Sequence, residues 1–249
     1  MNAPQNIYDD PEFFAGYRKL RETGTGLNDV LEQPALWSLL PSSLRGLTIL
    51  DLGCGFGGFA RKARTLGAAS VLGVDVSEKM LELAAQLTND DGIEYRRMGI
   101  EELSLDGRAF DLVVSSLALH YIPDYRAVLG KIVSVLRPGG NFVFSVEHPI
   151  CTALPQQQWV RDDKGEPLHW PVDNYRMEGE RHTNWFVEGV VKYHRTIESY
   201  VNGLIEAGLT IQRLLEPEPL VEALVSIPDL EQQRRRPPFL VIGTRRNER

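Results

Sequence analysis

The stretch from Leu47 to Phe59, LTILDLGCGFGGF, constrains the fold of this 249-residue chain more than any other part of it. A short apolar run with strand composition ends on Asp51, and a helix-forming segment begins at Phe59. Between them lie four glycines within six positions: Gly53, Gly55, Gly57 and Gly58. Such glycines let the backbone turn sharply and let a ligand lie against it. A strand, a glycine-rich turn and a helix in this order predict the opening of a nucleotide-binding βαβ unit.

The glycine spacing alone also fits the dinucleotide fingerprint, so Asp51 is the residue that separates two classes of cofactor. A dehydrogenase places a pyrophosphate at the N-terminus of the helix that follows, and a carboxylate beside it would repel that group. S-adenosylmethionine has no phosphate and carries an ammonium and a sulfonium, which an acid attracts. The alternative is that Asp51 only fixes the turn through local hydrogen bonds.

A second acid follows the next predicted strand, Ser70 to Val74. This acid, Asp75, comes 20 residues after Gly55. An acid at this position accepts the diol of a ribose in both cofactor classes, so Asp75 predicts a nucleoside without choosing between them. The alternative is an acid that caps a helix or lies in a solvated loop.

Four segments resemble, in order, the motifs of the class I S-adenosylmethionine-dependent methyltransferases: ILDLGCGFGGFA, VLGVDVSEKMLELA, FDLVVSSLALHYIPD and VLRPGGNFVFSVEHP. The resemblance covers about Leu47 to Glu147. Flanking segments resemble a bacterial branch that acts on small molecules: Tyr17 to Arg21, Asn28, HPICTA at 148–153 and YHRTIESYVNGLIEAG at 193–208. The resemblance implies an α/β, Rossmann-like fold with a seven-stranded, mostly parallel sheet and helices on both faces. Its last strand, Phe239 to Thr244, would be antiparallel and inserted between the fifth and sixth strands.

The resemblance also implies which residues bind S-adenosylmethionine. Arg21 would pair with the carboxylate of the cofactor, and Met80 would contact the adenine unless it serves only core packing. Gly99 stands where the family has an acid that accepts the adenine amine, so adenine recognition would rest on the backbone of Ile100 and on Glu101. The predicted cofactor-binding residues are Tyr17, Arg21, Asp51, Gly53, Gly55, Asp75, Val76, Met80, Ile100, Glu101 and Ser115.

The chain divides into three parts on this interpretation. Residues 1–46 predict two helices that form a cap over the cofactor cleft, or that only pack on the sheet edge. Residues 47–147 and 196–249 form the Rossmann-like core. Residues 148–195 have poor helical periodicity and contain Trp159, Trp170 and Trp185. We expect this insertion after the fifth strand to form a lid and an acceptor pocket, with arginines that orient an anionic group. These arginines are Arg161, Arg176, Arg181 and Arg195. An oligomer contact, or a cap without ligand contacts, is the alternative for the insertion.

Local signals set several predicted boundaries in the core. Ser77 and Thr196 are candidate helix caps, because their hydroxyls can accept a free N–H of the first turn. Arg137 to Gly140 predicts a tight turn before a fifth strand, Asn141 to Glu147. The run Arg234 to Arg236 is interpreted as a solvated face rather than a phosphate site.

Three histidines lie near the predicted methyl-transfer edge or return from the insertion: His120, His148 and His194. Each could act as a base or could orient the acceptor, although a single histidine is more often structural. An acceptor that is already anionic needs no base. The family's amino-methylating enzymes that act on nucleobases or amides often carry an Asn/Asp-Pro-Pro-aromatic motif after the fourth strand. The chain lacks it, which favours an oxygen, carbon or ordinary small-molecule amine as acceptor. No CxxC or HExxH spacing indicates a metal.

The formal net charge of −7 argues against a general nucleic-acid or membrane-surface role. The chain has two cysteines far apart and no apolar run near the ~20 residues that cross a bilayer. A reducing cytoplasm is the expected compartment. We therefore expect a small-molecule substrate, no nucleic acid and no membrane; the sequence leaves the oligomeric state open.

Three functions remain to be compared. The first is an enzyme that transfers a methyl group from S-adenosylmethionine to a small organic acceptor. The second is a non-catalytic S-adenosylmethionine-binding sensor or partner subunit. The third is an NAD-dependent oxidoreductase, which Asp51 opposes.

Overall fold

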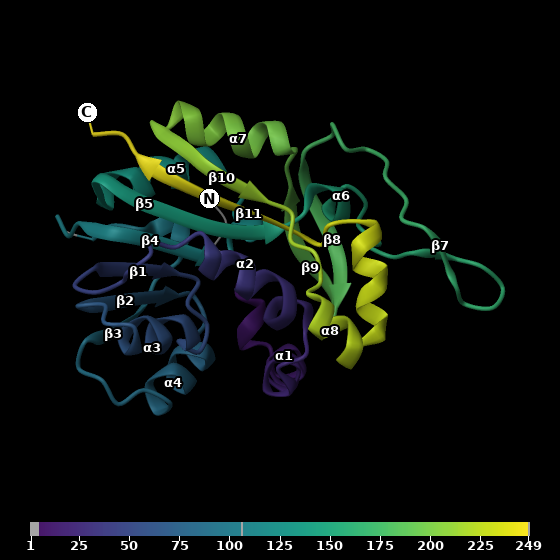
Figure 1. Ribbon diagram of the computed structural model, residues 1–249, viewed down its shortest axis with the longest axis horizontal. Helices are drawn as coiled ribbons and strands as arrows, with labels where there is room; N and C mark the ends of the chain where they lie inside the picture. The colour runs from purple at the N-terminus through teal and green to yellow at the C-terminus, as the bar shows by residue number, and fades with distance from the viewer. Residues whose placement is uncertain (1–4, 106, 249) are drawn as a thin grey trace.

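The computed structural model describes residues 5–105 and 107–248, and its centre is a seven-stranded sheet (Figure 1). The strand order is β10-β11-β5-β4-β1-β2-β3. Five of the strands pair in parallel, whereas β11 lies between β5 and β10 and is antiparallel to both. The predicted fold class is therefore confirmed, including the position of the last strand. The strands are β1 (Thr48–Leu52), β2 (Ser70–Asp75), β3 (Ile93–Arg97), β4 (Phe110–Ser116), β5 (Leu136–Glu147), β10 (Leu209–Leu215) and β11 (Phe239–Arg246).

Helices cover both faces of the sheet because successive strand residues are apolar on both sides. In β1, Leu50 joins a core cluster with residues of α5 (Tyr125–Val135) and α7 (Ile197–Glu206). The preceding residue, Ile49, joins a separate cluster with residues of α2 (Gln33–Ser38) and α3 (Gly58–Thr65). A strand that is apolar on both sides is typical of a parallel sheet with both faces covered.

The predicted capping residues begin their helices. The Ser77 hydroxyl accepts a hydrogen bond from Met80 N at the start of α4 (Glu78–Gln86), at 3.1 Å. Thr196 does the same for α7, where its hydroxyl accepts from Ser199 N at 3.1 Å. The turn predicted at Arg137 to Gly140 lies inside β5 rather than before it. The register of β5 against β4 shifts there, because Gly139 takes a left-handed φ of 73°.

The N-terminal segment forms two longer helical stretches and a single turn. The first stretch, α1 (Pro11–Thr23), is followed by a π-helical segment, η2 (Asn28–Glu32), that runs directly into α2. Further short helical turns occur along the chain: η1 (Ile7–Asp9), η3 (Ile100–Glu102), η4 (Leu119–Tyr121), α8 (Val221–Ser226) and η5 (Pro228–Arg235).

The insertion after β5 forms one short helix and two small hairpins. The helix is α6 (Pro149–Thr152). The first hairpin pairs β6 (Val160–Arg161) with β7 (Pro167–His169), and the second pairs β8 (Gly179–Trp185) with β9 (Val187–His194). In Figure 1 the β6–β7 hairpin projects from the body of the molecule, whereas β8, β9 and α1 lie beyond the carboxyl ends of the parallel strands.

Aromatic side chains join α1 to the β8–β9 hairpin. The rings of Phe13 and Trp185 meet edge to face with centroids 5.2 Å apart, and those of Tyr17 and Trp185 do so at 6.0 Å. Gln5 adds a backbone link, because its side chain donates to Val191 O and accepts from Val191 N. Two segments far apart in the sequence thus form one layer over the sheet's edge. In the described part of the chain, no helix combines the length and apolar character needed to cross a bilayer.

Candidate active site

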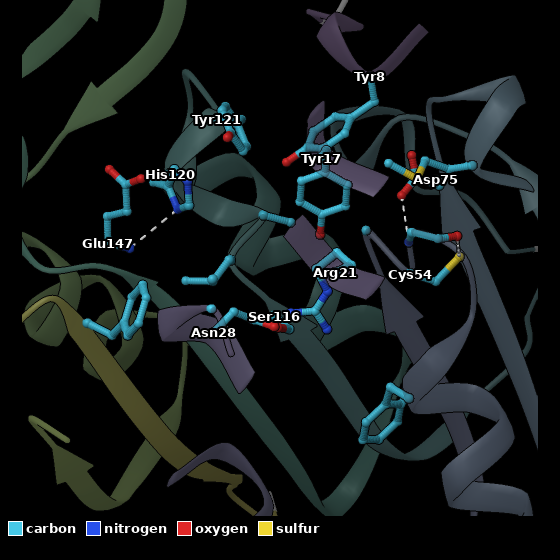
Figure 2. Close-up of a pocket in the computed structure, with 18 of the residues that line it drawn as sticks. Tyr8, Tyr17, Arg21, Asn28, Cys54, Asp75, Ser116, His120, Tyr121 and Glu147 are labelled. Atoms are coloured by element: carbon cyan, nitrogen blue, oxygen red, sulfur yellow. Dashed lines mark hydrogen bonds between the residues drawn. The ribbon is translucent and has the colours of Figure 1, made fainter. Parts of the chain in front are cut away.

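A cavity of about 680 Å³ lies at the carboxyl ends of the central strands, beneath this layer. Its volume is in the usual range for a small-molecule site. Figure 2 shows Asp75 and Cys54 on one side, His120 and Glu147 on the opposite side, and Tyr17 with Arg21 between them. Among the predicted site residues, those that line the cavity are Tyr17, Arg21, Asp51, Gly53, Gly55, Asp75, Val76, Met80, Ile100, Glu101 and His120.

The glycine loop after β1 brings backbone to the cavity wall. Gly53 has a left-handed φ of 73°, and a Cβ at this position would come within 2.6 Å of the Ala118 Cβ. Gly55 also has a positive φ, 52°, and its N–H donates to the Asp75 carboxylate at 2.9 Å. A larger residue at Gly53 would have a strained backbone, and its Cβ would collide with Ala118. The loop therefore needs glycine at this position.

Asp51 is a buried carboxylate without a partner. It is 2% exposed, and among the described residues its Oδ2 has no hydrogen-bond partner. Burial, together with the nearby charge of Asp75, raises the pKa of Asp51 to about 8. A buried carboxylate with no cation beside it holds its proton, and a cation brought into the cavity would favour the charged form.

Asp75 at the tip of β2 is held by backbone donors. Its two oxygens accept from Gly55 N and Ser77 N, each at 2.9 Å. Burial raises the pKa of Asp75, and these hydrogen bonds oppose that rise. Each carboxylate oxygen retains a lone pair that can accept from a ligand hydroxyl.

The cap contributes a cation that is incompletely paired. Arg21 Nη1 lies 3.0 Å from Asp29 Oδ1, yet among the described residues this buried nitrogen forms no hydrogen bond of acceptable geometry. The Arg21 guanidinium also lies 6.0 Å from the centre of the Phe56 ring in the glycine loop. Arg21 thus retains donor capacity between the cap and the loop.

Another wall of the cavity is mostly apolar. Met80 and Ile100 are 2% and 7% exposed, and Met98 lines the same wall. Gly99 caps η3, and Glu101 follows within it. Burial raises the pKa of Glu101. A flat apolar ligand fits a wall of this kind.

Three predicted site residues do not line the cavity. Ser115 is buried and its hydroxyl donates to Leu52 O at 3.0 Å, because alternation along β4 turns Ser116 to the cavity instead. His148 caps α6, where its Nδ1 accepts from Ile150 N and its Nε2 lies 2.8 Å from Glu216. His194 uses both ring nitrogens, on the Thr152 hydroxyl and on Tyr175 O, each at 2.8 Å. These three side chains therefore lie outside the cavity wall and are engaged by other groups of the protein.

Glu32 links η2 to the sheet by hydrogen bonds and was not identified from the sequence. This fully buried residue of η2 accepts from Ser116 at 2.9 Å and from Ser145 at 2.5 Å with one carboxylate oxygen. The other oxygen accepts from Asn28 at 2.7 Å and Gln33 at 2.8 Å. Burial raises the pKa of Glu32 and these hydrogen bonds oppose that rise. The sequence did contain a signal for this residue, because a charged side chain lies among apolar positions of the second predicted helix, Asn28 to Leu40.

On the far side of the cavity, Glu147 at the end of β5 has a permanent cation. Lys192 of β9 is 2% exposed, and its Nζ donates to Glu147 Oε1 at 2.6 Å. Gln157 donates to the other oxygen at 3.0 Å. Burial favours a raised pKa for Glu147, but Lys192 and His120 outweigh it and lower the pKa to about 2. Glu147 therefore stays ionised.

His120 is the one predicted histidine on the cavity wall. Its Nδ1 accepts from Glu147 N at 3.4 Å, so the neutral ring carries its proton on Nε2. Burial lowers the pKa of His120 to about 4. At neutral pH this side chain is an uncharged hydrogen-bond donor, which suits it to orient a ligand more than to remove a proton.

The anion-binding arginines predicted in the insertion do not line the cavity, whereas Arg236 does. Arg181 donates to Ala153 O, and Arg195 donates to the carbonyl oxygens of Ile122 and Pro123. The interpretation of Arg234 to Arg236 as a wholly solvated face is thus wrong for Arg236. Its side chain reaches inward and lies over the ring of Trp170.

Comparisons with known proteins match this geometry to a family. A family model described as a methyltransferase domain matches residues 50–144. The structure of an S-adenosylmethionine-dependent methyltransferase from Mesorhizobium loti is 44% identical, covers 89% of this chain and 100% of its own, and has a TM-score of 0.82. An uncharacterised protein of Haemophilus influenzae is 37% identical over the whole of both chains.

The chain belongs to the S-adenosylmethionine-dependent methyltransferases.

The enzyme class and the cofactor expected from the motifs are thereby confirmed, and the oxidoreductase alternative is wrong. In fold alone, the methyltransferase also resembles the N-methyltransferase NodS of Bradyrhizobium japonicum in complex with S-adenosyl-L-homocysteine. That structure is 21% identical, covers 95% of this chain and 99% of its own, and has a TM-score of 0.56. The cavity fits the cofactor, because the unpaired Asp51 carboxylate and the spare Arg21 donor match the ammonium and carboxylate of its methionine part.

Proposed function

We propose that this methyltransferase transfers the methyl group of S-adenosylmethionine to a small organic acceptor by in-line displacement, with an oxygen, carbon or amine as nucleophile. The observation that carries the proposal is the unpaired carboxylate of Asp51, buried in a cavity large enough for a cofactor and a small second ligand. When bound, the cofactor supplies an activated methyl group on its sulfonium. The protein then has to hold the acceptor in line and exclude water.

Within this proposal the cofactor half of the cavity has three polar anchors. Asp51 would accept from the ammonium, Arg21 would donate to the carboxylate, and Asp75 would accept from the ribose diol. The backbone at Gly53 and Gly55 leaves room for the ligand to approach. Tyr17 would cover it from the cap, and the adenine would rest among Val76, Met80, Ile100 and Glu101.

The acceptor half would be walled by the insertion. Cys151, Gln157, Trp170 and Trp185 of residues 148–195 line the cavity, and the aromatic contacts to α1 join this wall to the cap. We propose that residues 1–46 act as the cofactor cap and residues 148–195 as the lid over the acceptor, with 47–147 and 196–249 as the core. A cavity of about 680 Å³ favours a small molecule over a nucleic acid.

His120 would orient the acceptor in this scheme. Its Nε2–H is the ring's free donor while Nδ1 accepts from Glu147 N. Proximity and orientation can supply about 7–11 kcal/mol of the barrier reduction. An acceptor that is already anionic has no proton to lose, so it needs no further group as a base.

Titration calorimetry with S-adenosylmethionine tests the central assignment. We expect Asp51→Asn to weaken binding at least about 30-fold, because the ligand's ammonium then loses its charged partner. Asp91→Asn, at an exposed acid, is the matched control and should leave affinity unchanged. An Asp51→Asn variant that binds as well as the wild type would contradict the proposal.

Turnover separates the enzyme from a non-catalytic cofactor-binding protein. Release of S-adenosylhomocysteine in the presence of a panel of small acceptors, followed by mass spectrometry of the methylated product, should identify the nucleophile. Cofactor binding without product across a broad panel would favour a sensor or partner subunit instead.

A further inference from the structure

The acceptor half of the cavity contains an arginine with unused donors. Arg236 precedes β11, and its guanidinium carbon lies 4.0 Å from the ring centre of Trp170 and 5.7 Å from that of Trp159. Stacking on aromatic rings fixes the plane of a guanidinium and leaves its edge free to bind. Among the described residues, the buried Nε and Nη1 of Arg236 have no hydrogen-bond partner.

The two preceding arginines show how unusual this is. Arg235 donates to the backbone oxygens of Pro167 and Leu168 at 2.7 and 2.6 Å. Arg234 lies on the surface and pairs with Glu231 at 3.2 Å. Only the third member of the run lines the cavity. Buried donors without partners are costly, so an unpaired pair of them in a cavity points to a ligand that accepts hydrogen bonds.

Arg236 is too far along the sheet to serve the cofactor's carboxylate. Asp51, which would accept from the ammonium beside that carboxylate, lies in β1, whereas Arg236 precedes β11, and β4 and β5 lie between these two strands. Three strand spacings of ~4.8 Å each separate them by about 14 Å. Arg21 is the cation beside the glycine loop. The ligand of Arg236 is therefore on the acceptor side.

The charges around Arg236 favour an anion with one negative charge. Glu147 lines the same half of the cavity and stays ionised, but Lys192 already neutralises it. Cys151 also lies there, and burial raises the pKa of its thiol to about 12, so this thiol is neutral. One guanidinium thus remains without a counter-charge. A doubly charged phosphate would exceed the single charge of the guanidinium, whereas a carboxylate matches its charge and its planar fork.

We propose that Arg236, held against Trp170, binds a carboxylate group of the methyl acceptor. The inference rests on the proposed function, and it names the acceptor as an organic acid. The carboxylate would accept along the guanidinium edge that carries Nε and would anchor the acceptor at the β11 side of the cavity, so that the rest of the molecule extends towards His120.

Matched fragment probes test this on the intact protein saturated with S-adenosylhomocysteine. The probes are 3-phenylpropionate, 3-phenylpropionamide and phenethyl phosphate, titrated by ligand-observed NMR to about 10 mM, a range that detects millimolar affinity. We expect the carboxylate to bind about 10-fold or more tightly than the amide of the same shape, and more tightly than the phosphate.

Arg236→Gln should abolish the preference for the carboxylate and leave S-adenosylhomocysteine affinity within about twofold. Arg234→Gln, at the exposed start of the same run, is the matched control and should keep the preference. Arg236→Lys guards against a folding defect: it retains the charge but not the fork, so we expect an intermediate preference.

The possible outcomes separate this inference from the function beneath it. Failure of the wild type to bind S-adenosylhomocysteine would overturn both. Cofactor product binding with equal affinity for carboxylate and amide, with no carboxylate binding, or with tighter phosphate binding would overturn the carboxylate assignment alone. Retention of the preference in Arg236→Gln would show that another group binds the carboxylate and would overturn the role of Arg236.

Discussion

Two carboxylates at the tips of strands in one sheet behave in opposite ways. Asp51 ends the apolar run of β1 and Glu147 ends β5, and both line the same cavity. The pKa of Asp51 is raised to about 8, whereas the pKa of Glu147 is lowered to about 2. Burial acts on both in the same direction, so the difference comes from the neighbouring charges: Asp75 beside Asp51, and Lys192 beside Glu147.

This difference shows which of the two carboxylates receives its counter-charge from the chain. Beside β5 the chain supplies both members of the Glu147–Lys192 ion pair, so the charge of Glu147 is balanced before any ligand arrives. For Asp51 the chain supplies only the acid, and the cation that pairs with it has to come with the ligand. Asp51 is therefore placed to pair with a cation from a ligand, whereas Glu147 already has one from the chain.

The largest expected effect comes from removing the permanent cation. Lys192→Met leaves Glu147 buried beside no lysine, and we expect the free energy of unfolding at pH 7 to fall by about 3–5 kcal/mol, measured by urea denaturation. Adding Glu147→Gln should restore part of the loss. Lys19→Met, at an exposed lysine, is the control. A loss below about 1 kcal/mol would mean that the pair does not balance the acceptor half.

Removing the unpaired acid should have the opposite sign. In the ligand-free protein, Asp51→Asn should raise the free energy of unfolding at pH 8 by about 2 kcal/mol or more, because a strained buried carboxyl is replaced by a neutral group. The folded pKa is raised from 3.8 to about 8. The wild type therefore loses stability relative to the variant as pH rises through this window, and the two converge below it. Equal stability at pH 8 would contradict the assignment.

Binding of S-adenosylmethionine should release a proton from Asp51. The ligand's ammonium lowers the pKa of Asp51, so affinity should rise by at most about tenfold per pH unit below about pH 8 and then level. Calorimetry in two buffers of different ionisation enthalpy measures the proton release directly. In Asp51→Asn the affinity should lose this dependence. A wild-type affinity independent of pH between about 6 and 8 would show that Asp51 is already ionised.

The smallest effect concerns a single hydrogen bond in the acceptor half. Gln157 has a left-handed φ of 47°, which asparagine tolerates, but asparagine is too short to reach Glu147. Gln157→Asn should therefore lower the free energy of unfolding by about 1 kcal/mol. Affinity for S-adenosylmethionine should not change, and Gln158→Asn, at an exposed neighbour, is the control. A weaker cofactor affinity would show that the two halves are coupled.

Local chemistry explains why much of the fold was predictable. Ser77, Thr196 and Asp124 each accept a hydrogen bond from the residue three positions further along, so the sequence itself carries the signal for each helix start. The glycine loop and the acids Asp51 in β1 and Asp75 in β2 are equally local, and Gly53, Gly55 and both acids line the cavity. Ser115 was predicted to line the cavity, but Ser116 does so instead. The face to which a strand residue points depends on register, and a shift of one position reverses it.

The contacts of Glu147 and Glu32 could not be predicted from neighbouring residues in the sequence. The partner of Glu147 is Lys192, 45 positions later, and Glu32 meets Ser145 across 113 positions. His148 and His194 are close in sequence to residues that line the cavity, but both ring nitrogens of each are engaged in hydrogen bonds with other parts of the protein. Whether such residues reach a ligand depends on which side chains surround them, and no short segment contains that information.

The sequence by itself determined the sheet, the glycine loop and the acids of the cofactor half, because turns, caps and alternating apolar residues depend on neighbours in the chain. Only the tertiary structure decided that Glu147 is paired and Asp51 is not, and that the third arginine of an ordinary basic run stacks on Trp170 inside the cavity. The physical reason is that burial and charge pairing arise from segments brought together by the crossovers of the sheet, and they act on a side chain regardless of its distance along the chain.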